Sequence, residues 1–222
     1  MSTTLSQVYD RLRRVYGEQR MVAAASAWER LVGAILLQHA SWSAVENALT
    51  NLRESGIDEP RAMRSLAVDE LAELIQPTGH GQTKAKRLLN LLKLLHKQHD
   101  DSVESLLSQD RHALREQLMG VNGISAEVAD TIVLYAAELP VFVVNLATHR
   151  ILARHGWIDF EADYETIQDH LQGSLQRDVP LYAQFHEMLT QVGDEFCRKT
   201  PKCDGCPLQP LLRNGQPLEP YG

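Results

Sequence analysis

Several sequence features are absent from this chain of 222 residues, and each absence excludes a class of protein. No apolar run approaches the roughly 20 residues that cross a bilayer, and the segment from Met1 to Thr4 lacks a charged region followed by an apolar core. We therefore expect a cytoplasmic protein with no membrane partner. No Walker loop, dinucleotide-binding fingerprint, nucleophile elbow or paired-histidine zinc helix occurs, so the sequence points to none of the enzyme classes that carry these motifs.

The chain also lacks an excess of positive charge, since 22 Lys plus Arg against 29 Asp plus Glu give a net charge of −7. A nucleic-acid-binding protein of this balance must segregate its basic residues. Each basic cluster could instead be a solvated helix face, which is the favoured interpretation for Lys93 and Lys97, and the cations around the cysteine loop carry the most weight. The clusters are Lys84, Lys86, Arg87, Lys93 and Lys97, then Arg150 and Arg154, then Arg198, Lys199 and Lys202.

Strand patterns are almost absent, because apolar residues recur mostly at the three-and-four interval of amphipathic helices. The run Val141 to Val144 is β-branched, but one isolated segment cannot form a sheet. The sequence therefore predicts an all-α chain. Helices are expected over Leu5 to Tyr16, Trp28 to Leu37, Ser43 to Glu54, Pro60 to Leu66, Asp69 to Ile75, Thr83 to His99, Val103 to Leu107, Arg111 to Met119, Ser125 to Ala137, Leu146 to His155, Tyr164 to Leu171 and Pro180 to Phe196.

The stretch from Leu118 to Asp130 predicts a glycine hairpin between two helices. Gly123 can take the positive φ of a sharp reversal, and the second helix then starts with unpaired amides near Ser125. Such a helix start attracts phosphate without reading base sequence. We predict that Asn122, Gly123, Ile124 and Ser125 contact DNA; the alternative is an ordinary helical hairpin that ends in a glycine C-cap.

Four motifs in one order identify a family. After the hairpin comes the segment Pro140 to Arg150, and before it come Gly33 to Trp42 and Gly79 with Lys84 to Leu88; three cysteines follow near the C-terminus. Together these motifs resemble the helix-hairpin-helix (HhH-GPD) DNA glycosylases of the endonuclease III type over roughly residues 20 to 210. The segments around Gln38 and Phe142 are most similar to the monofunctional 3-methyladenine glycosylase branch.

The resemblance implies a two-lobed fold, with a helical barrel lobe at residues 22–134 and a second lobe from both chain ends, residues 1–21 and 135–222. DNA would enter between the lobes, and the partner would be double-stranded DNA containing damaged bases, bound by a monomer. Further predicted DNA contacts are Gln38, His39, Gly79, Lys84 and Arg150.

The two predicted catalytic positions depart from this family. Asn145 stands where the resemblance implies an aspartate that stabilises the sugar cation, and an amide supplies neither full charge nor a basic lone pair. The protein could be impaired, use another carboxylate, or carry a substitution introduced to trap a complex; Asn145 is also a good helix N-cap. Glu127 stands where lyases carry a lysine, and a carboxylate cannot form an imine. We predict no β-lyase activity, with Glu127 as a candidate base or, alternatively, a solvated helix residue.

Three cysteines, Cys197, Cys203 and Cys206, have the spacing of a metal loop, and thiols so close together favour metal ligation over disulfides. The resemblance implies a [4Fe–4S] cluster with four cysteines, but Leu212 occupies the fourth place. A cluster with another fourth ligand, a zinc ion, or a loop that folds by packing remain alternatives.

The sequence thus favours a monofunctional base-excision-repair glycosylase acting on damaged bases, with alkylated bases as one candidate class. The first alternative is a non-catalytic paralogue that binds lesions or bent DNA. The second is a helical scaffold whose hairpin contacts proteins, which would show no salt-dependent DNA affinity.

Overall fold

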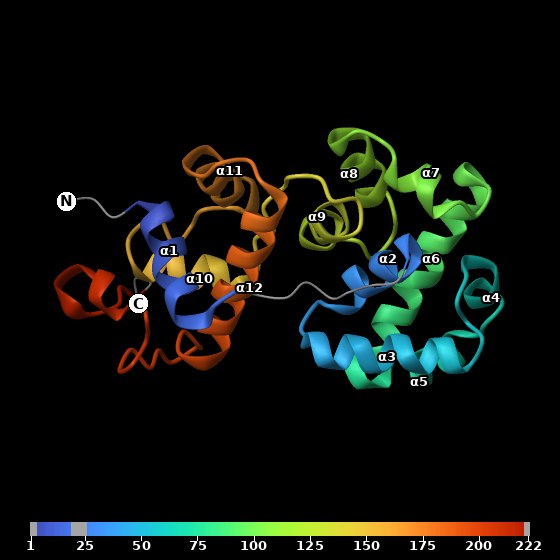
Figure 1. The fold of residues 1–222 in the computed structure, drawn as a ribbon, viewed down its shortest axis with the longest axis horizontal. Helices are drawn as coiled ribbons and strands as arrows, with labels where there is room; N and C mark the ends of the chain where they lie inside the picture. Colours follow the sequence, from blue (N-terminus) through green and yellow to red (C-terminus); the bar gives the residue numbers. More distant parts are fainter. Residues whose placement is uncertain (1–3, 19–25, 220–222) are drawn as a thin grey trace. The chain divides into compact units, whose positions relative to one another are not determined.

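The computed structural model describes residues 4–18 and 26–219 (Figure 1). It divides into two compact units, one formed by residues 22–139 and the other by residues 1–21 with 140–222. The lobe boundary predicted from the sequence, between residues 134 and 135, stays a prediction. Residues 1–3, 19–25 and 220–222 of the predicted lobes lie outside the described part. Within that part, no helix is long and apolar enough to cross a membrane.

The predicted all-α class is confirmed. In the described ranges the regular elements are helices, and the β-type pairing recorded there is one isolated bridge between Cys197 and Pro201. The unit of residues 22–139 contains α2 (Ala27–Leu36), α3 (Trp42–Glu54), α4 (Pro60–Arg64), α5 (Val68–Leu74), the 3-10 helix η1 (Gln76–Thr78), α6 (Gly81–His99), α7 (Val103–Leu107), α8 (Arg111–Met119) and α9 (Ala126–Tyr135). The other unit contains α1 (Leu5–Tyr16), α10 (Leu146–Arg154), α11 (Tyr164–Ser174), α12 (Val179–Glu195), η2 (Gln209–Leu211) and η3 (Arg213–Gly215).

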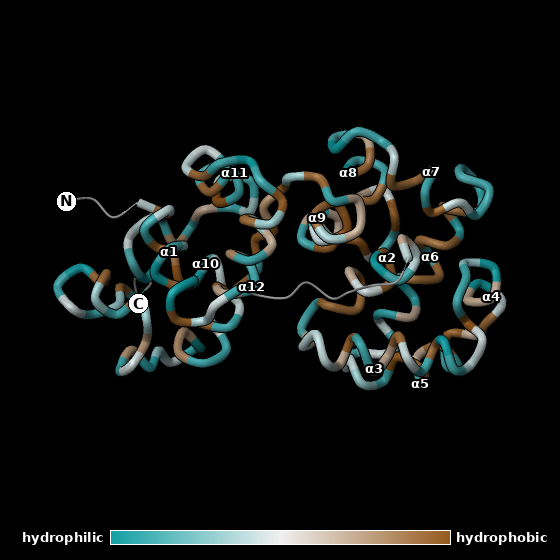
Figure 2. Tube along the Cα trace, in the orientation of Figure 1, coloured by the Kyte–Doolittle hydropathy of each residue, from teal (hydrophilic) through white to brown (hydrophobic). Residues whose placement is uncertain are grey.

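The core of the 22–139 unit is built around α2 and α9. Every residue of α9 from Val128 to Tyr135 is buried, and Figure 2 shows this helix as largely hydrophobic. A helix buried along this length must be covered on several sides, and α9 packs against both α2 and α8. At its end, the ring of Tyr135 meets Trp42 edge to face at 5.6 Å. The hairpin that precedes α9 is therefore anchored to the most buried helix of this unit.

Short polar side chains cap the start of several helices. Ser41 accepts the amide of Ala44, and Asp110 accepts the amides of His112 and Ala113. Each bond satisfies a backbone donor that the helix itself cannot pair, and such a cap contributes about 1 kcal/mol.

The unit formed by both chain ends is centred on α10 and α12, which pack closely. A Cβ atom added to Gly193 would lie 2.3 Å from the Cβ of Ala147, so only glycine permits this approach of the two helices. Beside them, Phe142 contacts the rings of Tyr182 and Phe185 at centroid distances of 5.4 Å and 5.8 Å. The start of α10 is thus fixed against α12.

The β-branched run Val141 to Val144 is buried but forms no strand. Its main chain is paired instead by side chains of α11. The Gln168 amide donates to the Phe142 carbonyl at 2.7 Å, and the Phe142 amide donates to Gln172 at 3.4 Å. Side chains four residues apart on one helix face therefore take the place of a neighbouring strand and hold this segment extended up to Asn145.

Candidate nucleic-acid interface and active site

The hairpin between α8 and α9 has buried anchors and an exposed tip. Val121 and Ile124 are buried, and the Ile124 amide donates to the Val121 carbonyl at 3.0 Å. Between and after them, Asn122, Gly123 and Ser125 are exposed. Gly123 has φ +93°, and a Cβ added there would meet nothing within 4 Å, so the backbone conformation alone requires glycine.

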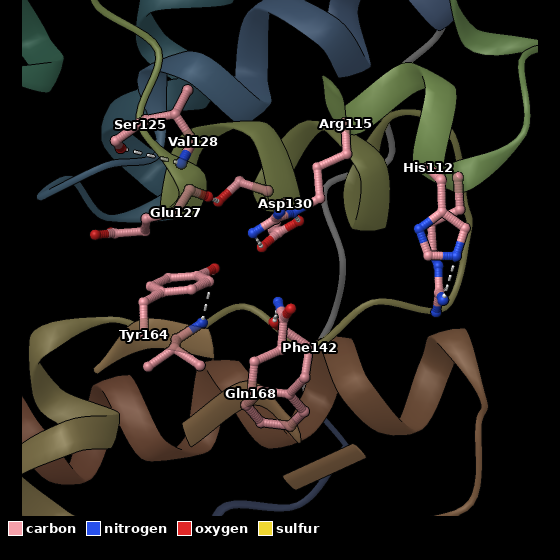
Figure 3. A network of polar contacts seen from close by, with 12 residues as sticks. His112, Arg115, Ser125, Glu127, Val128, Asp130, Phe142, Tyr164 and Gln168 are labelled. Carbon is pink, nitrogen blue, oxygen red and sulfur yellow. Dashed lines mark hydrogen bonds and ion pairs between the residues drawn. The ribbon is translucent and has the colours of Figure 1, made fainter. Parts of the chain in front are cut away.

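Ser125 caps α9 and leaves the first amides of this helix pointing outward. Its hydroxyl accepts the Val128 amide at 3.4 Å, an interaction drawn in Figure 3. The amides of the first turn have no carbonyl partner inside the helix, and the helix dipole adds positive potential there. The exposed tip and this helix start together form a surface of backbone donors suited to a phosphate.

Two side chains of α6 bind the carbonyl groups of the hairpin tip. The Arg87 Nε donates to the Gly123 carbonyl at 2.7 Å, and the Asn90 Nδ2 donates to the Asn122 carbonyl at 3.0 Å. Arg87 also donates from Nη1 to the Gln38 Oε1 at 2.7 Å. In the sequence Arg87 stands out only as a member of a basic cluster, and Asn90 is not among the predicted contacts. Their three-residue spacing, which puts both on one helix face, was the signal available.

Gln38 and His39, which follow α2, lie beside the turn that starts α6. The His39 ring lies 6.2 Å from the His80 ring, measured between centroids, and both residues have positive φ, 54° and 52°. Gly79, which precedes His80, is exposed with φ 67°. Left-handed backbone at non-glycine residues is uncommon and costs energy, so both loop ends are held by their surroundings. Gln38 joins the hairpin through Arg87, whereas His39 joins the Gly79 turn.

The structure overturns the prediction for Lys84. Its side chain is buried at 2% exposure, and its ammonium donates to the carbonyls of Leu36 at 2.8 Å and Thr78 at 2.7 Å. Burial, and then the charge of Arg87, lower the pKa of Lys84 to about 8. A group enclosed in this way cannot contact a phosphate. Lys84 instead joins the C-terminal end of α2 to η1.

The two carboxylates at the start of α9 differ in environment. Glu127 is half-buried in the first turn. Burial lowers the pKa of Arg87, and the negative charge of Glu127 acts in the opposite direction and raises it. Asp130 is fully buried and binds Arg115, whose Nε lies 2.8 Å from Oδ1 and whose Nη2 lies 3.3 Å from Oδ2 (Figure 3). Asp130 therefore joins α8 to α9, and Glu127 is the one of these two carboxylates with access to solvent.

In the other unit, Asn145 caps α10 and uses both ends of its carboxamide. Its Oδ1 accepts the Thr148 amide at 2.9 Å and the Thr148 hydroxyl at 3.1 Å. Its Nδ2 lies 2.7 Å from the Thr190 Oγ1 and 3.2 Å from the His186 Nε2. Because a backbone amide can only donate, Oδ1 must face Thr148 and Nδ2 must face α12.

The groups around Nδ2 are arranged as acceptors. The Thr190 hydroxyl donates to the His186 carbonyl at 2.9 Å, which leaves a lone pair toward Nδ2. His186 has Nδ1 at 3.5 Å from the Glu187 carboxylate, an arrangement that favours a proton on Nδ1 and a lone pair on Nε2. This network therefore suits an amide at residue 145, and a carboxylate would face two lone pairs. The helix-cap interpretation of Asn145 is confirmed.

The three cysteines lie in a loop that follows α12 and line one small pocket. Burial is the main cause that raises the pKa of Cys203 and Cys206, and nearby thiols add to it. Two cations of α10 bind the loop backbone. Arg150 donates to the Cys197 carbonyl at 2.9 Å, and the buried Arg154 donates to the carbonyls of Arg198 at 2.6 Å and Lys199 at 2.8 Å. Arg150, a predicted phosphate contact, thus has its Nε directed into this loop.

Comparison with known proteins agrees with this geometry. Residues 32–177 match the family model of the HhH-GPD superfamily base excision DNA repair proteins. The chain belongs to this superfamily. One relative, MJ1434 of Methanocaldococcus jannaschii, bears the provisional name of a DNA repair glycosylase and is 35% identical over 204 residues, which cover 91% of this chain and 93% of that protein.

Solved structures of HhH-GPD proteins share the fold. An endonuclease III trapped in a covalent intermediate with DNA gives a TM-score of 0.75 at 20% identity, covering 96% of this chain and 97% of that one. The 3-methyladenine DNA glycosylase of H. pylori, bound to 1,N6-ethenoadenine, gives 0.67 at 24% identity, covering 87% and 98%. The predicted two-lobed HhH-GPD glycosylase fold is confirmed.

The cysteine loop fits the implied [4Fe–4S] cluster only in part. Three thiols face one pocket, but Leu212, buried at 9% exposure, lines it in place of a fourth ligand. In the described ranges no group of three or more His, Cys, Asp or Glu side chains has the arrangement that holds a metal ion. The chain thus supplies an incomplete donor set for a cluster of four cysteines.

Proposed function

We propose that this HhH-GPD protein binds double-stranded DNA containing a damaged base and hydrolyses the N-glycosidic bond of that base without cutting the backbone. The hairpin supports the binding step most directly. Its exposed tip offers backbone amides, while Arg87 and Asn90 bind the tip carbonyls that would otherwise repel a phosphate. The names of two relatives, a DNA repair glycosylase and a 3-methyladenine DNA glycosylase, support damaged bases as the substrate class.

In the proposed reaction the damaged nucleotide leaves the stack and its C1′–N bond breaks. Water adds its oxygen to C1′, the bonding electron pair leaves with the base, and the water proton passes to a base on the protein or to the departing base. No covalent enzyme intermediate is needed. The absence of lyase activity follows from Glu127, since a carboxylate at that place cannot attack the sugar to form an imine.

The catalytic group of this chain is proposed to be Glu127. Its carboxylate is half-buried at the start of α9, beside the amides that would bind the backbone. A carboxylate there can stabilise the positive sugar and accept a proton from water. Asn145 carries no charge and has all four of its hydrogen-bonding positions used by Thr148, Thr190 and His186, so it cannot replace that charge.

The same saturation of Asn145 favours a second function, binding of lesions without catalysis. Asn145 uses every hydrogen-bond donor and acceptor of its side chain to cap α10 and to hold α10 to α12. It therefore has no donor or acceptor left to orient a water molecule. If Glu127 supplies no catalysis, the protein would recognise damaged DNA and leave base removal to another enzyme.

Base release from a panel of duplexes, each with one damaged base, separates the two functions. Catalysis predicts release by the wild type, loss by at least 100-fold in Glu127→Gln, and little change in Glu116→Gln, an acidic residue of α8 that serves as the matched control. Lesion-selective binding with no release in any variant would establish the second function. A borohydride-trapped covalent adduct with abasic DNA would contradict the absence of lyase chemistry.

A further inference from the structure

The guanidinium of Arg87 joins two parts of the 22–139 unit that are both predicted to contact DNA. Its Nε binds the Gly123 carbonyl at the hairpin tip, and its Nη1 binds Gln38 after α2, each at 2.7 Å. Residues 38 and 123 are far apart in sequence, and this side chain is a direct polar link between them. Asn90 binds the same tip at Asn122, so it provides a natural comparison.

We propose that Arg87 is a positioning residue. It couples the binding of Gln38 to DNA with the binding of the hairpin to the sugar-phosphate backbone. This proposal rests on the proposed DNA-binding function. Arginine suits the task because its planar fork holds two acceptors in fixed directions, whereas lysine has one rotatable ammonium.

The polarity of the link decides what each partner presents to DNA. At the tip, the Gly123 carbonyl is turned toward α6, so the amides face outward. At Gln38, Oε1 is occupied by Arg87, which leaves the Nε2 group as the donor available to a ligand. Gln38 should therefore favour a base edge that offers carbonyl oxygens or unprotonated ring nitrogens, and the link sets this preference.

A direct phosphate contact by Arg87 is the competing explanation, and its signature differs. Loss of one phosphate contact lowers the slope of log affinity against log salt by about 0.9, and lysine largely preserves such a contact. A positioning role predicts that Arg87→Lys loses nearly as much affinity as Arg87→Met, because a single ammonium nitrogen does not replace the two separate donors, Nε and Nη1, that bind Gly123 and Gln38.

Binding of lesion duplexes to single and double variants tests the coupling. We expect Arg87→Met and Arg87→Lys each to weaken DNA binding about tenfold. Gln38→Ala should weaken binding when introduced into the wild type but should have little effect when introduced into Arg87→Met. In the control cycle, Asn90→Ala and Gln38→Ala should combine multiplicatively, because Asn90 does not touch Gln38. The proposal would be overturned if the affinity losses of Arg87→Met and Gln38→Ala multiply in the double variant. It would also be overturned if Arg87→Lys binds with wild-type affinity while Arg87→Met shows a lowered salt slope.

Measurements on the free protein separate this proposal from the proposed function. In Arg87→Met the Gln38 side-chain amide signals should shift and the Ile124 amide should exchange faster with solvent, whereas Asn90→Ala should change only the hairpin. If the wild type binds no DNA, the proposed function fails, and these signals still decide whether Arg87 links the two segments. Unchanged Gln38 signals in Arg87→Met would overturn the link itself.

Discussion

Replacing Asn145 by aspartate reverses the polarity of one position in a closed hydrogen-bond network. In the protein, Nδ2 donates to Thr190 and to His186, and Oδ1 accepts from Thr148. The aspartate keeps the acceptor toward Thr148 but directs a negative oxygen at the lone pairs of Thr190 Oγ1 and His186 Nε2. The hydroxyl of Thr190 can turn to meet it only by releasing the His186 carbonyl.

The size of the effect follows from these contacts. Two lost hydrogen bonds cost about 1 kcal/mol each, and a partly buried polar group without a partner costs about 1–3 kcal/mol more. The negative charge at the start of α10 regains about 0.5–1 kcal/mol from the helix dipole. We expect Asn145→Asp to destabilise the protein by about 2–4.5 kcal/mol at pH 8, which lowers the melting temperature by about 4–18 °C in a chain of this size.

Melting curves of the wild type, Asn145→Asp and Asn145→Ser at pH 8 measure this loss. Serine keeps a helix cap without charge and places no negative oxygen against Thr190 and His186, so it should destabilise the protein less than aspartate. A fully stable Asn145→Asp at pH 8 would refute the proposed polarity of the network.

Three further predictions concern other parts of the chain. Gly123→Ala should lose about 1 kcal/mol of stability and about tenfold in DNA affinity because its φ of 93° disfavours a side chain. Gly173→Ala, in α11 with open space for a Cβ, should lose neither, and equal losses would contradict this. The pKa of Lys84 is lowered to about 8 in the folded protein, so the unfolded chain binds more protons between pH 8 and 10.5. The free energy of unfolding of the wild type, measured relative to Lys84→Met, should therefore rise across that window by up to about 3 kcal/mol. A difference between the two proteins that does not change with pH would exclude this shift. Treatment with a metal chelator should change the melting temperature by less than about 2 °C, because Arg154 and Arg150 hold the cysteine loop through its carbonyls. Bound iron whose removal lowers the melting temperature by more than this would contradict the prediction.

Local features of the sequence were sufficient to predict the hairpin and the helix starts. Gly123 is needed for backbone geometry, and Ser125 and Asn145 are short polar residues before apolar helical patterns, so their structure depends on neighbours a few residues away. The family resemblance then supplied the order of the elements. These predictions required no knowledge of distant contacts.

Charged side chains were harder to assign, because a basic cluster does not show which member faces the core. Lys84 shares its helix face with Leu88, Leu91 and Leu95, all buried, and that spacing was the available sign of its interior position. The partners of Asn145 are different in kind. Thr190 and His186 follow it by more than forty residues, on α12, so their match to an amide depends on tertiary packing.

Several cationic side chains are directed at carbonyl groups of the chain itself. Lys84 binds two carbonyls at the ends of α2 and η1, Arg87 binds the hairpin tip, and Arg150 and Arg154 bind the cysteine loop. At the hairpin tip this contact turns a partial negative charge inward and leaves backbone amides as the outward polar groups. A chain with a net charge of −7 can thereby offer positive potential locally, through amides and a helix start, without an excess of basic residues. The charge deficit that argues against a DNA-binding function is for this reason compatible with the hairpin that argues for it.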